Sequence, residues 1–238
     1  MPSSRYNWAG DTIVGDTIMW DKRAVLGYEN VYIPTDIREW ISSSDNETMK
    51  RALFEMDLPT ERKPGTFDQR AFKTWKYVSE NVEYVQDKVA MGMPDFWQFP
   101  AETLTLQKGD CEDTSFLLAS LMLASGISDH CVRVVLGKVI SSKGSFGHAW
   151  VVYQNEEGVW CLLESTLDKI PLQMPVADAF AEPGIKNQYQ PQFCLNRAHL
   201  WWIASVKMSI AEYIKMRDTK TQFDTNIDDF LLVDDEIF

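Results

Sequence analysis

The chain has 238 residues, 45% hydrophobic and 24% charged, a balance typical of a globular protein large enough to bury a sizeable core. It carries 23 Lys and Arg against 35 Asp and Glu, so its formal net charge is −12. This acidity repels phosphate backbones, so we expect no nucleic-acid partner. The N-terminal residues lack the apolar stretch of a secretory signal, and no run approaches the ~20 apolar residues of a spanning helix, so we expect no membrane partner.

The cysteines indicate a reducing compartment. The chain has four, Cys111, Cys131, Cys161 and Cys194, which lie far apart, and no C-x-x-C pair occurs. In a chain without an export signal this pattern favours free thiols over a disulfide framework or a zinc site. We therefore expect a cytoplasmic protein.

The sequence of the first part of the chain predicts short elements followed by one long helix. Residues 1–65 predict an irregular N-terminal layer with helices near Thr35 to Ile41 and Glu47 to Met56. Phe67 to Val85 places apolar residues at spacings of three and four, which predicts an amphipathic helix. Gly92 to Leu106 holds two prolines and is predicted to be mostly loop.

The middle of the chain predicts one strong helix followed by strands. The helix follows Asp110, a candidate cap, and ends at Ser125-Gly126, where glycine can adopt a left-handed conformation. Three valine-rich runs then predict strands, at Val132 to Val139, Ala149 to Tyr153 and Val159 to Leu163. A helix packed on an antiparallel meander predicts an α+β fold.

Cys111 is the cysteine best placed to act as a nucleophile. The thiolate, not the thiol, attacks a carbonyl, and both a helix N-terminus and a neighbouring imidazolium favour the thiolate. Cys111 begins the strong helix and follows Gly109, whereas the other cysteines lie in strand-like or aromatic runs. We interpret those three as packing residues.

His148 is the candidate base, and hairpin geometry offers two acids to orient it. His148 follows Ser141 to Gly147, a polar, glycine-rich segment that we expect to be a loop, and opens the next strand. A three-residue turn at 156–158 would align the two strands so that Glu164 and Asp168 both share the face of His148. Either carboxylate could hold the imidazole, and strand parity leaves the choice open.

These residues fall within motifs of a known family. Residues 109–114 (G-D-C-E-D-T) resemble the nucleophile motif of the transglutaminase-like superfamily, and in particular the bacterial transglutaminase-like cysteine proteinases, which share the G-D-C-E-D signature. Residues 96–104 (F-W-Q-F-P-A-E-T-L) resemble the segment that leads to the nucleophile. Residues 147–150 (G-H-A-W) match the histidine motif, and 160–166 (W-C-L-L-E-S-T) are similar to W-x-x-x-D-x-T, with Glu for Asp. The resemblance covers residues 66 to 170.

The resemblance implies a papain/transglutaminase-like α+β core with a catalytic triad. It implies Cys111 as the nucleophile, His148 as general base and acid, and Glu164 as the orienting carboxylate. Because Glu replaces the Asp of the motif, Asp168 stays an alternative acid.

The resemblance also implies an oxyanion hole and raises the question of a metal. The candidate donors are the Trp97 indole N–H and the Gln98 amide. Asp110, Glu112 and Asp113 crowd three carboxylates around the nucleophile, where like charge would oppose thiolate formation. Two explanations stay open: the carboxylates cap the helix, or they bind calcium as some of these proteinases do near this segment. No other cofactor is expected.

These features predict a thiol-dependent acyl-transfer enzyme. We expect an accessory layer at 1–65, the transglutaminase-like catalytic core at 66–205, and a C-terminal helix with an acidic tail at 206–238, either solvated or docked on a partner. The predicted activity is a cysteine peptidase or amidase, a hydrolase acting on a protein or peptide substrate. The alternatives are a cross-linking transglutaminase, or a non-catalytic structural component of a larger assembly such as a phage particle, which would place the protein in a virion.

Overall fold

The computed structural model of the chain describes residues 12–13, 19–24, 32–42, 46–61, 63–93, 95–141, 144–166 and 188–202. The predicted C-terminal helix and acidic tail lie outside these residues. Within the described ranges, none of the helices is both long enough and apolar enough to cross a membrane.

The chain alternates helices and strands before the central helix, and this helix (Cys111–Ala124) and an earlier one (Thr66–Asn81) are the two longest of the described helices. The helices are η1 (Ile37–Trp40, a 3-10 helix), α1 (Glu47–Glu55), α2 (Thr66–Asn81), α3 (Asp87–Ala90), α4 (Pro100–Leu106), α5 (Cys111–Ala124) and η2 (Asp129–Cys131, also 3-10). The strands are β1 (Thr12–Ile13), β2 (Met19–Ala24), β3 (Tyr32–Asp36), β4 (Glu83–Tyr84), β5 (Lys108–Gly109), β6 (Val132–Ser141), β7 (Gly144–Gln154), β8 (Trp160–Leu163), β9 (Gln188–Leu195) and β10 (Leu200–Trp202).

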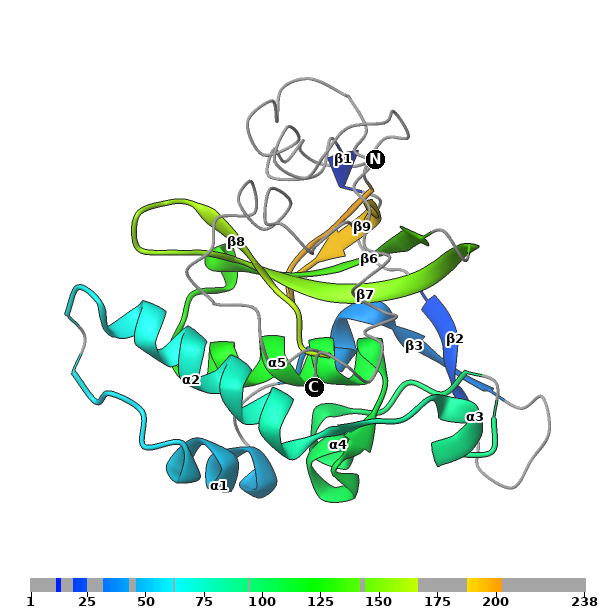
Figure 1. The fold of residues 1–238 in the computed structure, drawn as a ribbon, viewed down its shortest axis with the longest axis horizontal. Coiled ribbons are helices and arrows are strands. Elements are labelled where there is room, and N and C mark those ends of the chain that lie inside the picture. Colours follow the sequence, from blue (N-terminus) through cyan, green and yellow to red (C-terminus); the bar gives the residue numbers. More distant parts are fainter. Residues whose placement is uncertain are drawn as a thin grey trace.

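The main sheet is antiparallel and has helices on one side. Its strand order is β1-β10-β9-β6-β7-β8, and every neighbouring pair in it is antiparallel. In Figure 1 the helices α1, α2, α4 and α5 lie together below the sheet, with α5 next to β6 and β7. This two-layer arrangement confirms the predicted α+β class, with a helix packed on an antiparallel sheet.

Helix α5 lies at the centre of the molecule and is buried on every side. Residues 111–122 are all buried, including the polar first turn that contains Glu112, Asp113 and Thr114. A helix that is apolar around most of its circumference is one that other elements surround. The sheet covers one side of α5, and α2, α1 and α4 cover the others.

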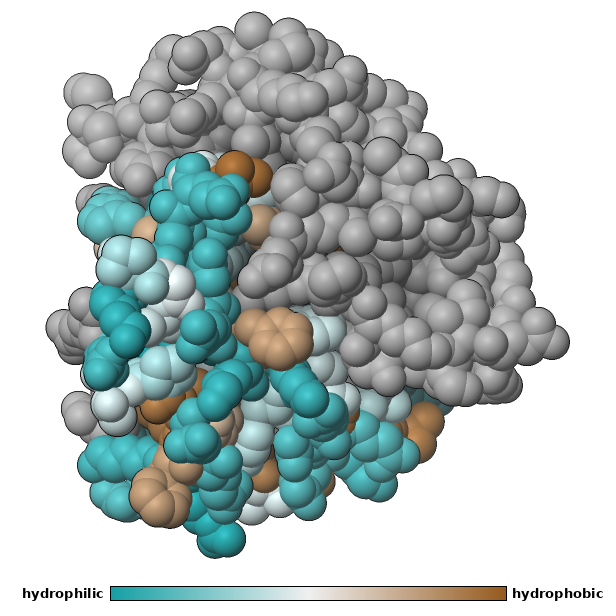
Figure 2. Space-filling view, turned by 60° about the vertical axis from the view of Figure 1, so that its left-hand side comes forward, coloured by the Kyte–Doolittle hydropathy of each residue, from teal (hydrophilic) through white to brown (hydrophobic). Residues whose placement is uncertain are grey.

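The residues before position 65 contribute to the core. Ile37, Trp40 and Met49 are at most 1% exposed and belong to the same hydrophobic cluster as α5. The Trp40 ring stacks on Phe99 and contacts Trp97 edge-on, with ring centroids 5.5 and 5.4 Å apart. On the face drawn in Figure 2, the described surface is mostly hydrophilic, with apolar side chains scattered singly, as expected for the outer side of amphipathic elements.

One predicted helix and one predicted loop differ from the structure. The predicted Phe67 to Val85 helix ends at Asn81, because the chain then forms β4, which pairs in parallel with β5. The 92–106 segment was predicted to be mostly loop, yet its last part forms α4. Pro100 occupies the start of α4, and the Glu102 carboxylate accepts a hydrogen bond from the Phe99 N–H at 2.8 Å. Proline at the first helical position, with Glu two residues later, is a helix-start signal that outweighs the loop tendency of proline.

The predicted loop at Ser141 to Gly147 is wrong for most of its length. The β6–β7 ladder runs out to the pair Ser141 and Gly144, so His148 lies inside β7, opposite Gly137. Pairing with a long partner strand overrides the turn preference of a glycine-rich segment when the partner supplies the hydrogen bonds. Strands β9 and β10 complete the sheet from a distant part of the chain and were not predicted.

The β7–β8 hairpin is held against the start of helix α2. The Glu156 carboxylate accepts hydrogen bonds from the backbone N–H groups of Gly65 and Phe67, the latter at 3.0 Å. Asp68 accepts bonds from the Glu156 N–H at 3.1 Å and from the Tyr153 hydroxyl at 2.8 Å. Glu156 thus satisfies N–H groups at the start of α2 that have no partner inside the helix.

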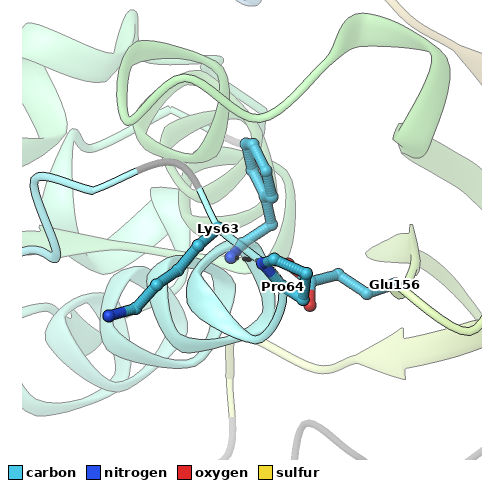
Figure 3. Close-up of a pocket in the computed structure, with 4 residues that line it drawn as sticks. Lys63, Pro64 and Glu156 are labelled. Atoms are coloured by element: carbon cyan, nitrogen blue, oxygen red, sulfur yellow. Dashed lines mark hydrogen bonds between the residues drawn. The ribbon is translucent and has the colours of Figure 1, made fainter.

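A shallow pocket of about 350 Å³ lies at this contact. It is lined by Lys63, Pro64, Phe67 and Glu156 (Figure 3), and none of the candidate catalytic residues lines it.

We predict that Glu156→Ala lowers the free energy of unfolding by about 1 kcal/mol, because the substitution removes the cap from α2. The matched control is Glu157→Ala, which removes the same charge from an exposed neighbour and should change stability by less than about 0.5 kcal/mol. Urea unfolding of the two variants makes the comparison. Equal losses would mean that charge, not the contact with α2, determines the effect.

Gly109 allows the first turn of α5 to approach the preceding strand. A Cβ atom at Gly109 would lie 2.6 Å from Asp113 Cβ and 2.8 Å from Asp113 Oδ2. Contacts this short force atoms to move, and Asp113 Cβ is fixed to the helix backbone. A side chain at position 109 would therefore displace Asp113 or the start of α5.

We predict that Gly109→Ala lowers the free energy of unfolding by roughly 1–3 kcal/mol, the usual cost of overpacking. Gly147→Ala is the matched control, since a Cβ atom there meets nothing within 4 Å, and it should stay within about 0.5 kcal/mol of the parent. Thermal and urea unfolding report both effects. A Gly109→Ala variant as stable as the Gly147→Ala variant would contradict the assigned contact.

Candidate active site

Cys111 lies at the start of α5, facing strand β7. The chain reaches it through β5, and the Asp113 carboxylate accepts a hydrogen bond from the Asp110 N–H at 3.3 Å, as in a capping box. Cys111 is 9% exposed, and the backbone of Ala149, the residue after His148, lies close enough to the sulfur to lower the pKa of the thiol. This contact places the sulfur beside the strand that carries His148.

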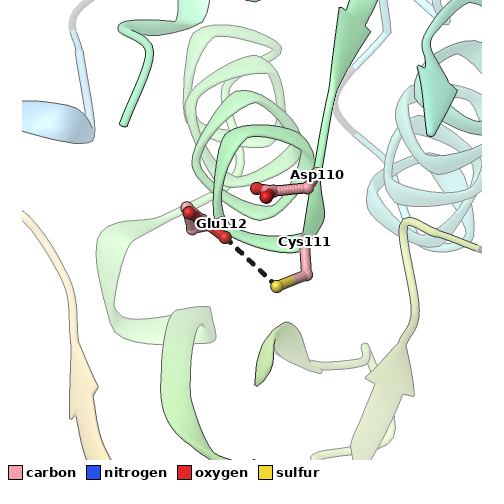
Figure 4. A group of neighbouring side chains, drawn as sticks. All are labelled: Asp110, Cys111 and Glu112. Atoms are coloured by element: carbon pink, nitrogen blue, oxygen red, sulfur yellow. Dashed lines mark hydrogen bonds between the residues drawn. The ribbon is translucent and has the colours of Figure 1, made fainter. Parts of the chain in front are cut away.

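The surroundings of Cys111 work against the thiolate. Its thiol donates a hydrogen bond to Glu112 Oε2 at 3.1 Å, and the Asp110 carboxylate lies on the same side of the sulfur as Glu112 (Figure 4). Burial first, and then the negative charges of Glu112 and Asp110, raise the pKa of the Cys111 thiol well above its usual value, while the Ala149 backbone lowers it. The helix N-terminus, which the sequence suggested would favour the thiolate, is outweighed in this arrangement.

His148 and Glu164 form a buried pair. His148 Nε2 lies 2.8 Å from Glu164 Oε2, and the two residues are 5% and 0% exposed. Burial of a charged carboxylate requires such a partner. The contact leaves Nδ1 as the other ring nitrogen of His148.

The hairpin register that was predicted from the turn is the register of the structure. The Asn155 N–H donates to the Val159 carbonyl at 2.9 Å, Gly158 has a φ of 78°, and Val151 pairs with Leu163. Glu164 follows the last residue of β8 and therefore lies beside His148. Asp168, the alternative acid, lies outside the described residues.

The segment before α4 is bonded to the nucleophile helix. The Gln98 backbone N–H and side-chain Nε2 donate to the two Asp113 carboxylate oxygens, each at 2.7 Å, and Gln98 is 1% exposed. The Trp97 ring packs against Phe116 of α5, with centroids 5.4 Å apart, and its carbonyl accepts the Trp40 indole N–H at 3.2 Å. Gln98 therefore anchors Asp113, and this segment lies directly against the first turn of α5.

The structure adds two acidic residues to the three carboxylates predicted around Cys111. Side-chain oxygens of Asp87, Asp110 and Asp113 lie within 4.8 Å of one another, and the same holds for Asp87, Asp95 and Glu112. Within the predicted set, Asp110 lies in one group with Asp113 and Asp87 and in another with Glu112 and the Cys111 sulfur. No local signal marked Asp87 and Asp95. Asp87 follows β4, which pairs with β5, and Asp95 precedes Gln98, which bonds to Asp113.

This carboxylate cluster concentrates negative charge in a buried place. Asp113, Asp87 and Glu112 are 0%, 3% and 8% exposed. Burial, followed by the charge of Asp110, raises the pKa values of Asp113 and Glu112 well above the usual range. Asp110 Oδ1 is buried and has no hydrogen-bond partner among the described residues. Hard cations such as calcium bind oxygen donors of this kind, so the chemistry of the cluster fits such an ion.

Part of the chain matches the model of a known family. Residues 57–165 match the family model described as the transglutaminase-like superfamily. No protein in a comparison with curated sequences matches the chain.

Several solved structures are similar in fold. LapG from Legionella pneumophila is 19% identical, covering 76% of this chain and 94% of that chain, with a TM-score of 0.47. Its calcium-bound form is 19% identical over 72% of this chain and 87% of that chain, also with a TM-score of 0.47. A candidate cysteine protease from Cytophaga hutchinsonii is 18% identical over 66% of this chain and 48% of that chain, with a TM-score of 0.37. The family model spans the segments that contain Cys111, His148 and Glu164.

Proposed function

We propose that the protein is a thiol-dependent acyl-transfer enzyme of the cysteine peptidase or amidase type. Cys111 is the nucleophile, His148 the general base and acid, and Glu164 the residue that orients His148. The observation that carries this proposal is the buried His148–Glu164 pair at 2.8 Å, with His148 on strand β7, which packs against the helix of Cys111. An acid, an imidazole and a thiol in this order constitute a nucleophilic triad.

The reaction follows from these roles. His148 takes the thiol proton, and the Cys111 sulfur attacks the carbonyl carbon of a peptide or carboxamide. The C–N bond breaks, His148 gives its proton to the departing amine, and a thioester remains on Cys111. Water, deprotonated by His148, then attacks the thioester, releases the acid and restores the thiol. The Cys111 N–H, the Trp97 indole and the Gln98 side-chain amide are proposed to bind the oxyanion. The Gln98 backbone N–H and one Nε2–H donate to Asp113, and Nε2 carries a second hydrogen.

Two alternatives differ at one step each. If a lysine amine replaces water, the product is a cross-linked protein, and the enzyme is a transglutaminase. If the site does no chemistry, the protein is a binding or structural component that retained the fold. Mass spectrometry of a peptide substrate distinguishes a hydrolysed product from an amine adduct, and labelling of Cys111 distinguishes both from an inert site.

We predict that iodoacetamide labels Cys111 before the other three cysteines near neutral pH in calcium-containing buffer. His148→Ala should slow this labelling by about 100-fold, since general acid–base groups contribute at least that much, and Glu164→Gln should also slow it. His130→Ala is the control, because His130 lies in η2, outside the triad. Peptide mapping gives the rate at each cysteine. Equal labelling of Cys131, or a rate at Cys111 that ignores His148, would refute the triad.

We further propose that the carboxylate cluster binds a calcium ion through Asp87, Asp110 and Asp113. The support is the convergence of these oxygens within 4.8 Å in a buried site. When bound, the ion supplies positive charge that offsets the carboxylates beside Cys111. Helix capping is the alternative explanation of why these carboxylates gather at the start of α5. The hydrogen bond from the Asp110 N–H to Asp113 supports capping for Asp113 alone.

We predict that EGTA lowers both the melting temperature and the Cys111 labelling rate, and that added calcium restores both. Calcium at 100 times its dissociation constant should stabilise the protein by about 2.7 kcal/mol. Asp87→Asn should abolish the response, whereas Asp57→Asn, at an exposed aspartate, should leave it intact. Cys131 provides an internal control, since its labelling rate should not depend on calcium. Indifference to EGTA in metal-free buffer would leave helix capping as the explanation of the cluster.

A further inference from the structure

The Glu164 carboxylate is bound at both of its oxygens, by different kinds of residue. Oε2 faces His148, and Oε1 accepts two hydrogen bonds from Thr166, one from its backbone N–H at 3.1 Å and one from its hydroxyl at 2.8 Å. Thr166 is the last described residue of this segment. Its side chain bonds to Glu164 and so fixes the side chain that orients His148.

The backbone around Glu164 is fixed independently of Thr166. The Trp75 indole N–H, from helix α2, donates to the Glu164 carbonyl at 2.7 Å, and Trp75 is 4% exposed. The Ser165 hydroxyl donates to the Thr114 hydroxyl at 2.9 Å, and Thr114 donates in turn to the Asp110 carbonyl at 2.9 Å. These buried bonds tie the residue after the acid to the first turn of the nucleophile helix.

A fixed backbone does not by itself orient a glutamate carboxylate. The terminal torsion of glutamate is broad, so a carboxylate held at one oxygen can rotate about its last bond. Two donors on Oε1 restrict that rotation and leave Oε2 facing the imidazole. A glutamate needs such donors more than an aspartate does, because its side chain has one more rotatable bond.

We propose that Thr166 is a positioning residue that acts through Glu164, holding Oε1 so that Oε2 engages His148. This inference rests on the proposed function of Cys111, His148 and Glu164, and it goes beyond it by assigning a role to a residue outside the triad. Substitution of Thr166 removes only the hydrogen bond from its hydroxyl, because every variant keeps the backbone N–H that also bonds to Oε1.

The test compares three substitutions by the rate of Cys111 alkylation in calcium-containing buffer. Thr166→Val exchanges the hydroxyl for a methyl group of similar shape and should lower the rate about 10-fold, the effect of one hydrogen bond to a charged group. Thr166→Ser keeps the hydroxyl and should stay within about twofold of the parent. In a Glu164→Ala background there is no carboxylate to position, so adding Thr166→Val should change the rate less than about twofold. Melting temperatures establish that each variant is folded when labelled.

Two results would overturn the inference. The first is a Thr166→Val variant that reacts at the parental rate. The second is a Thr166→Val substitution that lowers the alkylation rate by the same factor in the parent and in the Glu164→Ala variant, since a merely structural effect would not depend on Glu164. If Thr166→Val does not fold, Thr166→Ala removes the same hydroxyl and is judged by the same criteria. If Glu164→Ala itself reacts at the parental rate, the proposed function fails and the role of Thr166 fails with it. If Glu164→Ala lowers the alkylation rate but the Thr166 variants react at the parental rate, the triad stands and the positioning role is refuted.

Discussion

The Asp113 carboxylate joins the three chain segments that meet where helix α5 begins. It is fully buried and accepts hydrogen bonds from the Gln98 backbone, the Gln98 side chain and the Asp110 N–H. A buried carboxylate without donors would cost far more than these bonds contribute, so the segment that contains Gln98 has to lie against the first turn of the helix. The placement of Trp97, the cap at Asp110 and the need for glycine at position 109 all follow from this one group.

The other half of the site depends on helix α2. Its first turn binds Glu156 at the tip of the β7–β8 hairpin, and Trp75, near its middle, binds the Glu164 carbonyl just after β8. The hairpin is therefore held near both ends of β8. Because His148 and Glu164 lie on the two sides of that hairpin, a rigid α2 contact keeps their separation constant, which is what a catalytic pair requires.

The carboxylates around Cys111 destabilise the site electrostatically. Asp87, Asp95, Asp110, Glu112 and Asp113 gather beside one thiol, and mutual repulsion and burial raise the pKa values of Asp113 and Glu112. Carboxylates whose folded-state pKa is raised destabilise the fold as the pH rises above their unfolded values. Helix capping explains Asp113, which has several donors, but not the approach of Asp87 and Asp95. A cation bound by Asp87, Asp110 and Asp113, as proposed above, would offset part of this negative charge.

The sequence by itself determined the features that depend on neighbours along the chain. The start of α5 at Cys111, the left-handed turn at Gly158 and the β7–β8 register were all predicted, because periodicity, capping and turn length act over a few residues. Strand parity could place Glu164 on the face of His148, but it could not choose between Glu164 and Asp168 on its own.

Only the tertiary structure decided the contacts between distant segments. It brought Asp87 to α5 through the β4–β5 pair and Asp95 through the segment that bonds to Asp113. It also extended β7 through a glycine-rich segment by pairing with β6, and it set Glu164 between His148, Thr166 and Trp75. The physical reason is that α5 is buried on all sides. The partners of its polar first turn must come from whichever segments cover it, and no local pattern specifies which segments those are.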